Sequence, residues 1–402
     1  MKYLHLAVWS PRNSFGGNET IIRTSSVEQK VMGHDVFVVG RIEGDQHKIL
    51  QTQLNGVQYI EVQDRGRRRP SSLAVGVGGL ILLLWEILFT LFRLTPVVIR
   101  IVRKEKIDVV IFYSIHLFCM SPLLRMWGTK TVLGLEVISN NPYPSVLSIV
   151  HWFRKIKYKF FNGVFTHTGK FYLPDGTVFD NLSLLKKYAG SVAVSYIPWG
   201  INIEKTRKVA KEKNKLSLKK DSYEKIIICA SRLVEEKGVK YLLEAVPYVL
   251  KKFPSTLFIF ASDGILRNYL EKRSRELKVE KNILFTGFLL HQEVLSAIKL
   301  CDLIVVPSSA FETFGIIFLE AYVLRVPIVT TRFGGIPNVV HDKETGILVP
   351  PKNIEKLQES IIYLLDHKDE ARRLTDRGYK LVYKEYQLKA ALKKLDIFLH
   401  EI

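Results

Sequence analysis

The chain has 402 residues, of which 47% are hydrophobic, and a formal net charge of +20. This length exceeds what one hydrophobic core usually organises, so we expect two domains of roughly 200 residues each. Such a charge suits nucleic acid, but no helix-turn-helix, zinc-ligand or RNA-binding aromatic motif appears. The three cysteines lie inside apolar runs without metal-ligand spacing, which indicates buried thiols in a reducing cytoplasm: Cys119, Cys229 and Cys301.

The N-terminus reads as a strand followed by a glycine-containing loop. Residues 1–9 hold a short apolar run without a small-residue cleavage site, which indicates a first strand and not a signal peptide. The loop after it ends in Gly16 and Gly17, and a helix is expected from near Thr20. Paired glycines at a helix start let the backbone approach a phosphate closely. An ordinary loop pair is an equally good interpretation of these two residues alone.

Residues 73–92 form an apolar run of about the length of a membrane span. Its one charge is Glu86, and arginines flank it on both sides, so the asymmetry that orients a span is missing. A span would also divide one parallel sheet across the bilayer, and a helix buried inside the protein would normally keep a polar face. We therefore expect a helix lying in the membrane interface, with basic flanks on anionic headgroups.

Alternating strand and helix patterns in the first half predict a parallel sheet. Strands are expected over 107–112 and 129–136, and further strands over 163–168 and 192–202. The lysine-rich segment 205–225 then reads as a solvated linker. His116 follows the first of these strands, and we interpret it as a loop or helix-face histidine.

In the second half, a buried strand over 226–230 is followed by Arg232 and Lys237. Both side chains leave the same strand tip and can meet at one sheet edge. A planar guanidinium and a point-charge ammonium together suit a diphosphate.

A second strand, 302–307, leads into a loop with Glu312 and a helix with Glu320. Ligands of open α/β sheets bind at the carboxyl ends of strands, where Glu312 is expected. Eight residues are close to a multiple of 3.6, so both carboxylates share roughly one face. Backbone N–H groups at a helix N-terminus suit a phosphate, and here they belong to Thr313, Phe314 and Gly315. This arrangement predicts a sugar-nucleotide pocket, whereas a surface helix with two solvated glutamates is the competing interpretation.

A third segment, 330–350, contains Gly334-Gly335-Ile-Pro and Thr345-Gly346-Ile-Leu-Val. With the two preceding segments it resembles the C-terminal half of glycosyltransferase family 4, retaining sugar-nucleotide enzymes of the GT-B fold. The family pattern is Arg-x4-Lys-Gly, Glu-x7-Glu, Gly-Gly-x-Pro-Glu and Thr-Gly-x-Leu-Val. Asn338 stands where the family usually has Glu.

The resemblance implies an α/β fold with two Rossmann-like domains facing across a cleft. Expected boundaries are 1–203 for the acceptor domain, 204–385 for the donor domain and 386–402 for a C-terminal helix returning to the first domain. The implied reaction is transfer of a sugar from a nucleotide diphosphate to a hydroxyl, with retention and without a metal or other cofactor. The acceptor is expected to be a lipid-linked or membrane-proximal glycan or lipid at the cytoplasmic face of the membrane.

The resemblance also implies roles for single residues. Glu312 would hold the transferred sugar and Glu320 the ribose, while Arg232 and Lys237 would stabilise the departing diphosphate. The Gly-Gly-x-Glu loop of the family, which meets the donor diphosphate, matches Gly16, Gly17, Asn18 and Glu19. The base would lie near Phe288 and Leu289.

Glu136 occupies a position where family members often carry histidine near the reacting hydroxyl. A carboxylate can accept that hydroxyl proton, which makes Glu136 a candidate catalytic residue. A glutamate at a helix N-terminus is an equally good interpretation. Two other classes remain open for the whole chain: a sugar-nucleotide epimerase of the same fold and a non-catalytic membrane-associated binding protein.

Overall fold

The computed structural model describes residues 1–10, 17–43, 48–64, 90–113, 117, 120–135, 158–173, 175–211, 222–310 and 312–402. By contacts the chain divides into two compact units. The N-terminal unit comprises residues 1–167, 181–197 and 392–402, and the C-terminal unit comprises 168–180 and 198–391. Several predicted features lie outside the described residues: Gly16, residues 73–89, His116, Cys119 and Glu136.

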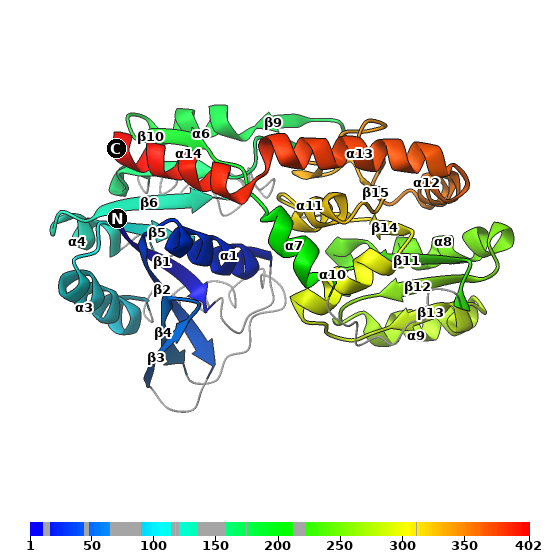
Figure 1. The fold of residues 1–402 in the computed structure, drawn as a ribbon, viewed down its shortest axis with the longest axis horizontal. Coiled ribbons are helices and arrows are strands. Elements are labelled where there is room, and N and C mark those ends of the chain that lie inside the picture. The colour runs from blue at the N-terminus through cyan, green and yellow to red at the C-terminus, as the bar shows by residue number, and fades with distance from the viewer. Residues whose placement is uncertain are drawn as a thin grey trace, which may run out of the picture. The chain divides into compact units, whose positions relative to one another are not determined.

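The N-terminal unit is built on one eight-stranded sheet of order β10-β7-β6-β5-β1-β2-β4-β3 (Figure 1). Neighbouring strands pair in parallel, except β3, which is antiparallel to β4. The strands are β1 (Lys2–Trp9), β2 (Asp35–Glu43), β3 (Ile49–Leu54), β4 (Val57–Asp64), β5 (Val109–Phe112), β6 (Lys130–Leu135), β7 (Gly163–Thr166) and β10 (Ala193–Tyr196). The expected strands near the N-terminus and in the four later ranges are thus confirmed.

Helices and apolar strand residues together form the core of this unit. The helical elements are α1 (Gly17–Val31), the π-helix η1 (Thr90–Leu94), α3 (Thr95–Glu105), α4 (Ser121–Arg125), the 3-10 helix η4 (Tyr158–Phe160) and α6 (Asn181–Ala189). The whole of β5 and β7 is buried, as expected for parallel strands covered on both faces. Leu6, Val98 and Leu133 belong to the resulting apolar cluster.

The end of the last helix, α14 (Leu388–Glu401), packs in the N-terminal unit. The Tyr3 hydroxyl donates to Asp396 at 2.6 Å, and Lys130 Nζ donates to the Leu399 carbonyl at 2.9 Å. A Cβ on Gly163 would lie 2.7 Å from the Phe398 ring, so the absence of a side chain lets the helix approach β7. Residues 392–402 therefore belong to the N-terminal unit.

The C-terminal unit contains a six-stranded parallel sheet of order β13-β12-β11-β14-β15-β16 (Figure 1). Its strands are β11 (Lys225–Cys229), β12 (Thr256–Phe260), β13 (Ile283–Phe285), β14 (Leu303–Val306), β15 (Ile328–Thr331) and β16 (Ile347–Val349). Its helices are α7 (Ile203–Val209), η6 (Glu235–Lys237), α8 (Val239–Lys252), α9 (Arg267–Glu276), η7 (Glu280–Asn282), α10 (His291–Leu300), α11 (Ile316–Val323), η8 (Ile336–Asn338), α12 (Ile354–Asp366) and α13 (Lys368–Glu385). Two Rossmann-like units of the GT-B type confirm the expected fold class.

A two-stranded hairpin from the first half of the chain packs in the C-terminal unit. It consists of β8 (Lys170–Tyr172) and β9 (Val178–Asp180). Tyr172 and Gly334 exchange two backbone hydrogen bonds of 2.9 and 2.8 Å. The Asn338 side chain, at the position where the family usually has Glu, accepts from the Lys170 N–H and donates to its carbonyl. This hairpin lies inside the range expected for the N-terminal domain, and sequence reasoning missed it.

Part of the expected linker is a helix. The Asn202 side chain accepts from the Lys205 N–H and caps α7, whose Thr206 is buried. The Arg207 guanidinium lies 4.7 Å from the centre of the Tyr379 ring. Lys205, Arg207 and Lys208 are exposed, as expected of a solvated segment, but the cap and the tertiary contacts make 203–209 helical; 212–221 lie outside the described residues. Within the described chain, no helix has both the length and the hydropathy needed to cross a membrane.

Candidate functional site in the C-terminal unit

A partly buried ion pair lies at the carboxyl edge of the C-terminal sheet. Lys237 Nζ donates to Glu312 Oε2 at 2.6 Å, and the two side chains are 16% and 13% exposed. The Ser308 hydroxyl donates to the same carboxylate oxygen at 3.4 Å. Lys237 follows β11 and Glu312 follows β14, which are neighbours in the sheet. The structure therefore joins two predicted site residues that are 75 positions apart in the sequence.

Gly238 and the Glu236 carbonyl hold these two loops together. Gly238 has a φ of +65°, and a Cβ there would lie 1.9 Å from the Pro307 carbonyl oxygen. The Glu236 carbonyl accepts from the N–H groups of Ser309 and Ala310. Only glycine permits this approach, since it combines a left-handed backbone with no side chain.

Arg232 lies on the same loop but in a different environment. Its guanidinium is 62% exposed and lies 3.7 Å from Glu236. Arg232 is thus positioned at the sheet edge in water, whereas Lys237 is nearly enclosed. A joint role on a diphosphate stays a prediction for these two side chains.

Glu320 is buried on α11 and held by a histidine that the sequence interpretation missed. Its carboxylate is 5% exposed, and Oε1 lies 2.5 Å from Nε2 of His291, the first residue of α10. With Glu312 only 13% exposed and paired with Lys237, the interpretation of two solvated surface glutamates is wrong. The sequence signal for His291 is weak, because a single histidine at a helix start has many ordinary roles.

The loop from Thr313 to Gly315 is fixed by the glycine pair of the third motif. The Gly335 N–H donates to the Glu312 carbonyl at 2.8 Å, and a Cβ on Gly335 would lie 1.7 Å from the Thr313 carbonyl oxygen. Gly315 begins α11 with a φ of +79°. The first N–H groups of α11 have no partner inside the helix and carry its positive dipole end. Anion binding by the N–H groups of Thr313, Phe314 and Gly315, which precede this helix, stays a prediction.

The side chains around this loop have structural roles. Phe314 is buried, and its ring lies 5.7 Å from that of Tyr386. The Thr168 hydroxyl donates to the Thr313 carbonyl at 2.7 Å. Leu289, expected near the base, lies between β13 and α10, two residues before His291. The Phe314 ring is therefore part of the packing of the C-terminal unit.

Burial removes Cys229 as a candidate nucleophile. This residue ends β11, and burial raises the pKa of its thiol to about 11, against smaller opposing effects of Ser231 and Lys237. The thiol is therefore protonated at neutral pH and inert. Both Cys229 and Cys301 are buried free thiols, as expected.

The N-terminal unit has a buried polar cluster at the carboxyl end of β1 that sequence reasoning did not find. Ser10 Oγ donates to Glu61 Oε1 at 2.5 Å, and the Ser10 N–H donates to the Arg41 carbonyl. Glu61 and Arg41 are 0% and 4% exposed. α1 begins at Gly17, three residues before the start expected near Thr20.

No group of three or more histidines, cysteines, aspartates or glutamates is arranged to hold a metal ion within the described residues. That the reaction needs no metal stays a prediction.

Residues 210–381 match the family described as glycosyl transferases group 1. This match covers 172 of the 402 residues of the chain. The chain is 32% identical over 177 residues to alpha-D-kanosaminyltransferase of Streptomyces kanamyceticus, covering 44% of this chain and 46% of that protein. It is 24% identical over 219 residues to a GDP-mannose-dependent alpha-(1-6)-phosphatidylinositol monomannoside mannosyltransferase of Mycobacterium tuberculosis, covering 53% and 57%. The chain thus spans about half the length of the curated relatives it matches.

Solved structures that resemble the whole chain share its fold at low sequence identity. Sucrose-phosphate synthase from Thermosynechococcus elongatus superimposes with a TM-score of 0.72 at 19% identity, covering 99% of this chain and 98% of that one. HepE from Anabaena, in complex with UDP and glucose, has a TM-score of 0.73 at 16% identity, with both chains fully covered. These similarities show that the GT-B fold extends over the whole chain.

Proposed function

We propose that the chain is a retaining glycosyltransferase that moves a sugar from a nucleotide diphosphate sugar to a hydroxyl. One observation carries this: the partly buried Lys237–Glu312 pair lies at the carboxyl edge of the C-terminal sheet, with Glu312 in the loop that leads into α11. The cation and the helix N–H groups suit the diphosphate of a donor, and the carboxylate suits its sugar hydroxyls.

In the proposed reaction, the main electrostatic demand is the negative charge that grows on the departing diphosphate. Lys237, Arg232 and the first N–H groups of α11 would stabilise this charge. Lys237 would then be shared between the diphosphate and Glu312, whose Oε2 atom lies 2.6 Å from Lys237 Nζ. Glu312 would accept hydrogen bonds from the sugar hydroxyls. Glu320, enclosed and held by His291, would accept from the ribose.

The acceptor is proposed to be a lipid-linked or membrane-proximal glycan or lipid, with the enzyme peripheral to the cytoplasmic membrane face. The net charge of +20 supports an anionic surface as partner. The name of one relative specifies phosphatidylinositol mannoside as its acceptor. Glu136 as an acceptor-side base and Gly16 and Gly17 as diphosphate contacts stay part of this proposal.

The test is release of nucleoside diphosphate from a panel of nucleotide sugars in the presence of membrane lipid extract. Wild type should release one nucleoside diphosphate, and the product should keep the anomeric configuration of the donor by NMR. Lys237→Ala should lose at least about tenfold in turnover, because a charge-assisted bond strengthens in the transition state. Lys240→Ala is the control, since Lys240 pairs with Glu235 at the surface three residues away. Sugar modification without nucleoside diphosphate release would indicate an epimerase instead.

A further inference from the structure

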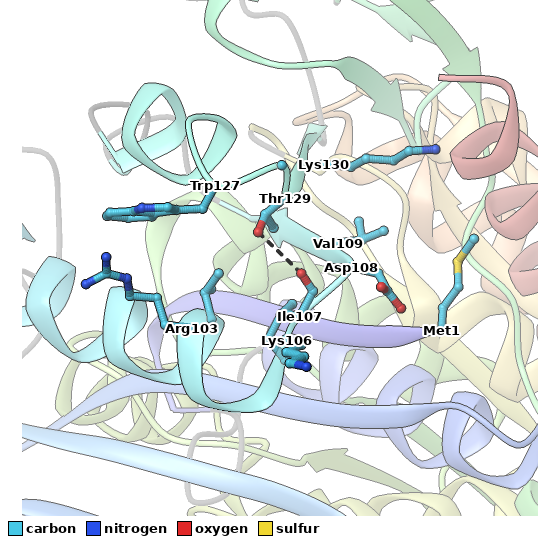
Figure 2. A pocket seen from close by; sticks show the side chains of 11 residues that line it. Met1, Arg103, Lys106, Ile107, Asp108, Val109, Trp127, Thr129 and Lys130 are labelled. Atoms are coloured by element: carbon cyan, nitrogen blue, oxygen red, sulfur yellow. Dashed lines mark hydrogen bonds between the residues drawn. The ribbon is translucent and has the colours of Figure 1, made fainter.

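An exposed apolar and basic surface lies on α3 and on the turn between α4 and β6 of the N-terminal unit. Phe92 is 72% exposed, Met126 79% and Trp127 42%. The Arg103 guanidinium lies 4.7 Å from the centre of the Trp127 ring and joins the helix to the turn (Figure 2). Large apolar side chains gathered beside cations on a surface mark a binding face more often than chance exposure does.

The inward and outward faces of α3 are sharply different. Thr95, Val98, Ile101 and Val102 are buried, whereas Pro96, Arg100, Arg103 and Lys104 are exposed. Phe92 and Arg103 are eleven residues apart, about three helical turns, so they lie on roughly one side of η1 and α3. The outward face therefore runs from an aromatic ring at one end to the Arg103–Trp127 stack at the other.

A hollow of about 790 Å³ opens beside this stack (Figure 2). Arg103 and Lys106 at the end of α3 form one wall, and Trp127 and Thr129 form the other. The Thr129 hydroxyl donates to the Ile107 carbonyl at 3.3 Å across the floor. β5 and β6 begin here, so the hollow lies at the opposite sheet edge from the carboxyl ends, where α/β folds bind substrates.

The charges at the hollow favour an anion. Lys130 Nζ is committed to the Leu399 carbonyl, and Asp108 accepts from the Lys2 N–H. Among the described residues, neither Arg103 nor Lys106 is paired with a carboxylate. Two cations beside an indole ring suit a phosphate headgroup at a membrane interface, where tryptophan and arginine both concentrate.

We propose that this surface docks on an anionic bilayer, with a lipid phosphate between Arg103 and Lys106 and with Met126, Trp127 and Phe92 among the upper acyl chains. This proposal rests on the membrane location in the proposed function, and it assigns the contact to described residues, of which Phe92 is the last residue of the apolar run 73–92. Each cation near an anionic surface contributes about a fivefold gain in partitioning. Losing two should reduce it about 25-fold.

The experiment is flotation of the full chain with vesicles of phosphatidylcholine alone or with 30% phosphatidylglycerol. Arg103→Gln with Lys106→Gln should reduce binding to anionic vesicles about 25-fold at low salt. Met126→Ser with Trp127→Ser should reduce it at low and high salt, because the apolar part is not screened. Lys272→Gln with Arg275→Gln, two exposed cations of α9, is the matched control and should bind like wild type.

Unchanged flotation of both surface variants would overturn the proposal, as would equal binding of the wild type to neutral vesicles. If the surface variants lose binding to a single-stranded RNA but keep vesicle binding, the surface belongs to a nucleic-acid site and the proposal is overturned as well. Thermal unfolding and nucleoside diphosphate binding of each variant report separately on folding and on the proposed function. A protein that binds vesicles through this surface but no nucleotide would refute only the function.

A second inference comes from the donor site and concerns His291. Glu320 is 5% exposed, and one of its oxygens lies 2.5 Å from His291 Nε2. A carboxylate enclosed to this degree is costly without a partner that fixes its direction. We infer that His291 is a positioning residue: it holds Oε1 and leaves Oε2 for the ribose hydroxyls. This inference rests on the ribose assignment in the proposed function.

The test compares a nucleoside diphosphate with its 2′,3′-dideoxy form, using the base that binds best among UDP, GDP and ADP. His291→Ala should weaken binding of the intact nucleotide about tenfold and leave the dideoxy form unchanged. His291→Gln, whose amide nitrogen can replace Nε2, should recover binding to within about threefold. Equal weakening for both nucleotides would mean a merely structural role and overturn the inference. If wild type binds no nucleoside diphosphate, the proposed function fails as well, whereas binding independent of His291 refutes only the positioning role.

Discussion

Removing either member of the Lys237–Glu312 pair should destabilise the C-terminal unit, apart from any effect on catalysis. The side chains are 16% and 13% exposed and their charged atoms are 2.6 Å apart. Breaking a fully buried pair costs about 3–5 kcal/mol, because one charge is left without compensation. Because both side chains keep some exposure to water, we expect Lys237→Ala to lower the free energy of unfolding by about 2–3 kcal/mol. In a unit of roughly 200 residues, this lowers Tm by about 5–10 °C.

The double-mutant cycle distinguishes an ion-pair effect from loss of packing. Lys237→Met with Glu312→Leu removes both charges and keeps the volume, so its stability should return to within about 1 kcal/mol of wild type. Urea unfolding followed by tryptophan fluorescence gives the four free energies of unfolding. A coupling energy below about 0.5 kcal/mol would refute the reasoning, since it would show that water already screens the pair.

Three further predictions concern the same fold. Gly335→Ala should disrupt the loop before α11, because the new Cβ would lie 1.7 Å from a carbonyl oxygen; Gly176→Ala, with a φ of +87° and no atom within 4 Å, should cost only about 1–2 kcal/mol by thermal unfolding. Glu320→Gln should mainly weaken nucleotide affinity, whereas Glu312→Gln should mainly reduce turnover; equal losses in nucleoside diphosphate binding by calorimetry would contradict this division. Burial lowers the pKa of His5 to about 4, below its ordinary value of 6.5. The unfolded state therefore binds more protons, and stability should fall by up to about 3 kcal/mol from pH 6.5 to 4. His5→Gln should flatten this part of the pH–stability curve.

The sequence by itself determined the architecture and the main motifs of the C-terminal half. Alternating strand and helix patterns predict parallel sheets, and β1, β5, β6, β7 and β10 lie where they were expected. Gly315 and Gly334 both have positive φ values, a backbone conformation that glycine adopts readily and that its presence in a predicted loop allows. These features are local, because period, turn residues and helix starts depend on neighbours in the chain.

Only the tertiary structure decided which of these residues meet. Glu312 and Glu320 share a face in the sequence pattern, yet each is held by a different distant partner, Lys237 and His291. The hairpin β8–β9 joins the C-terminal unit through backbone bonds to Gly334, which leave no periodic signal in the sequence. The burial of these glutamates and their pairing with Lys237 and His291 arise from contacts between loops at the sheet edge. The order of the strands in the sheet decides which loops are neighbours. Spacing along the chain carries no information about that order.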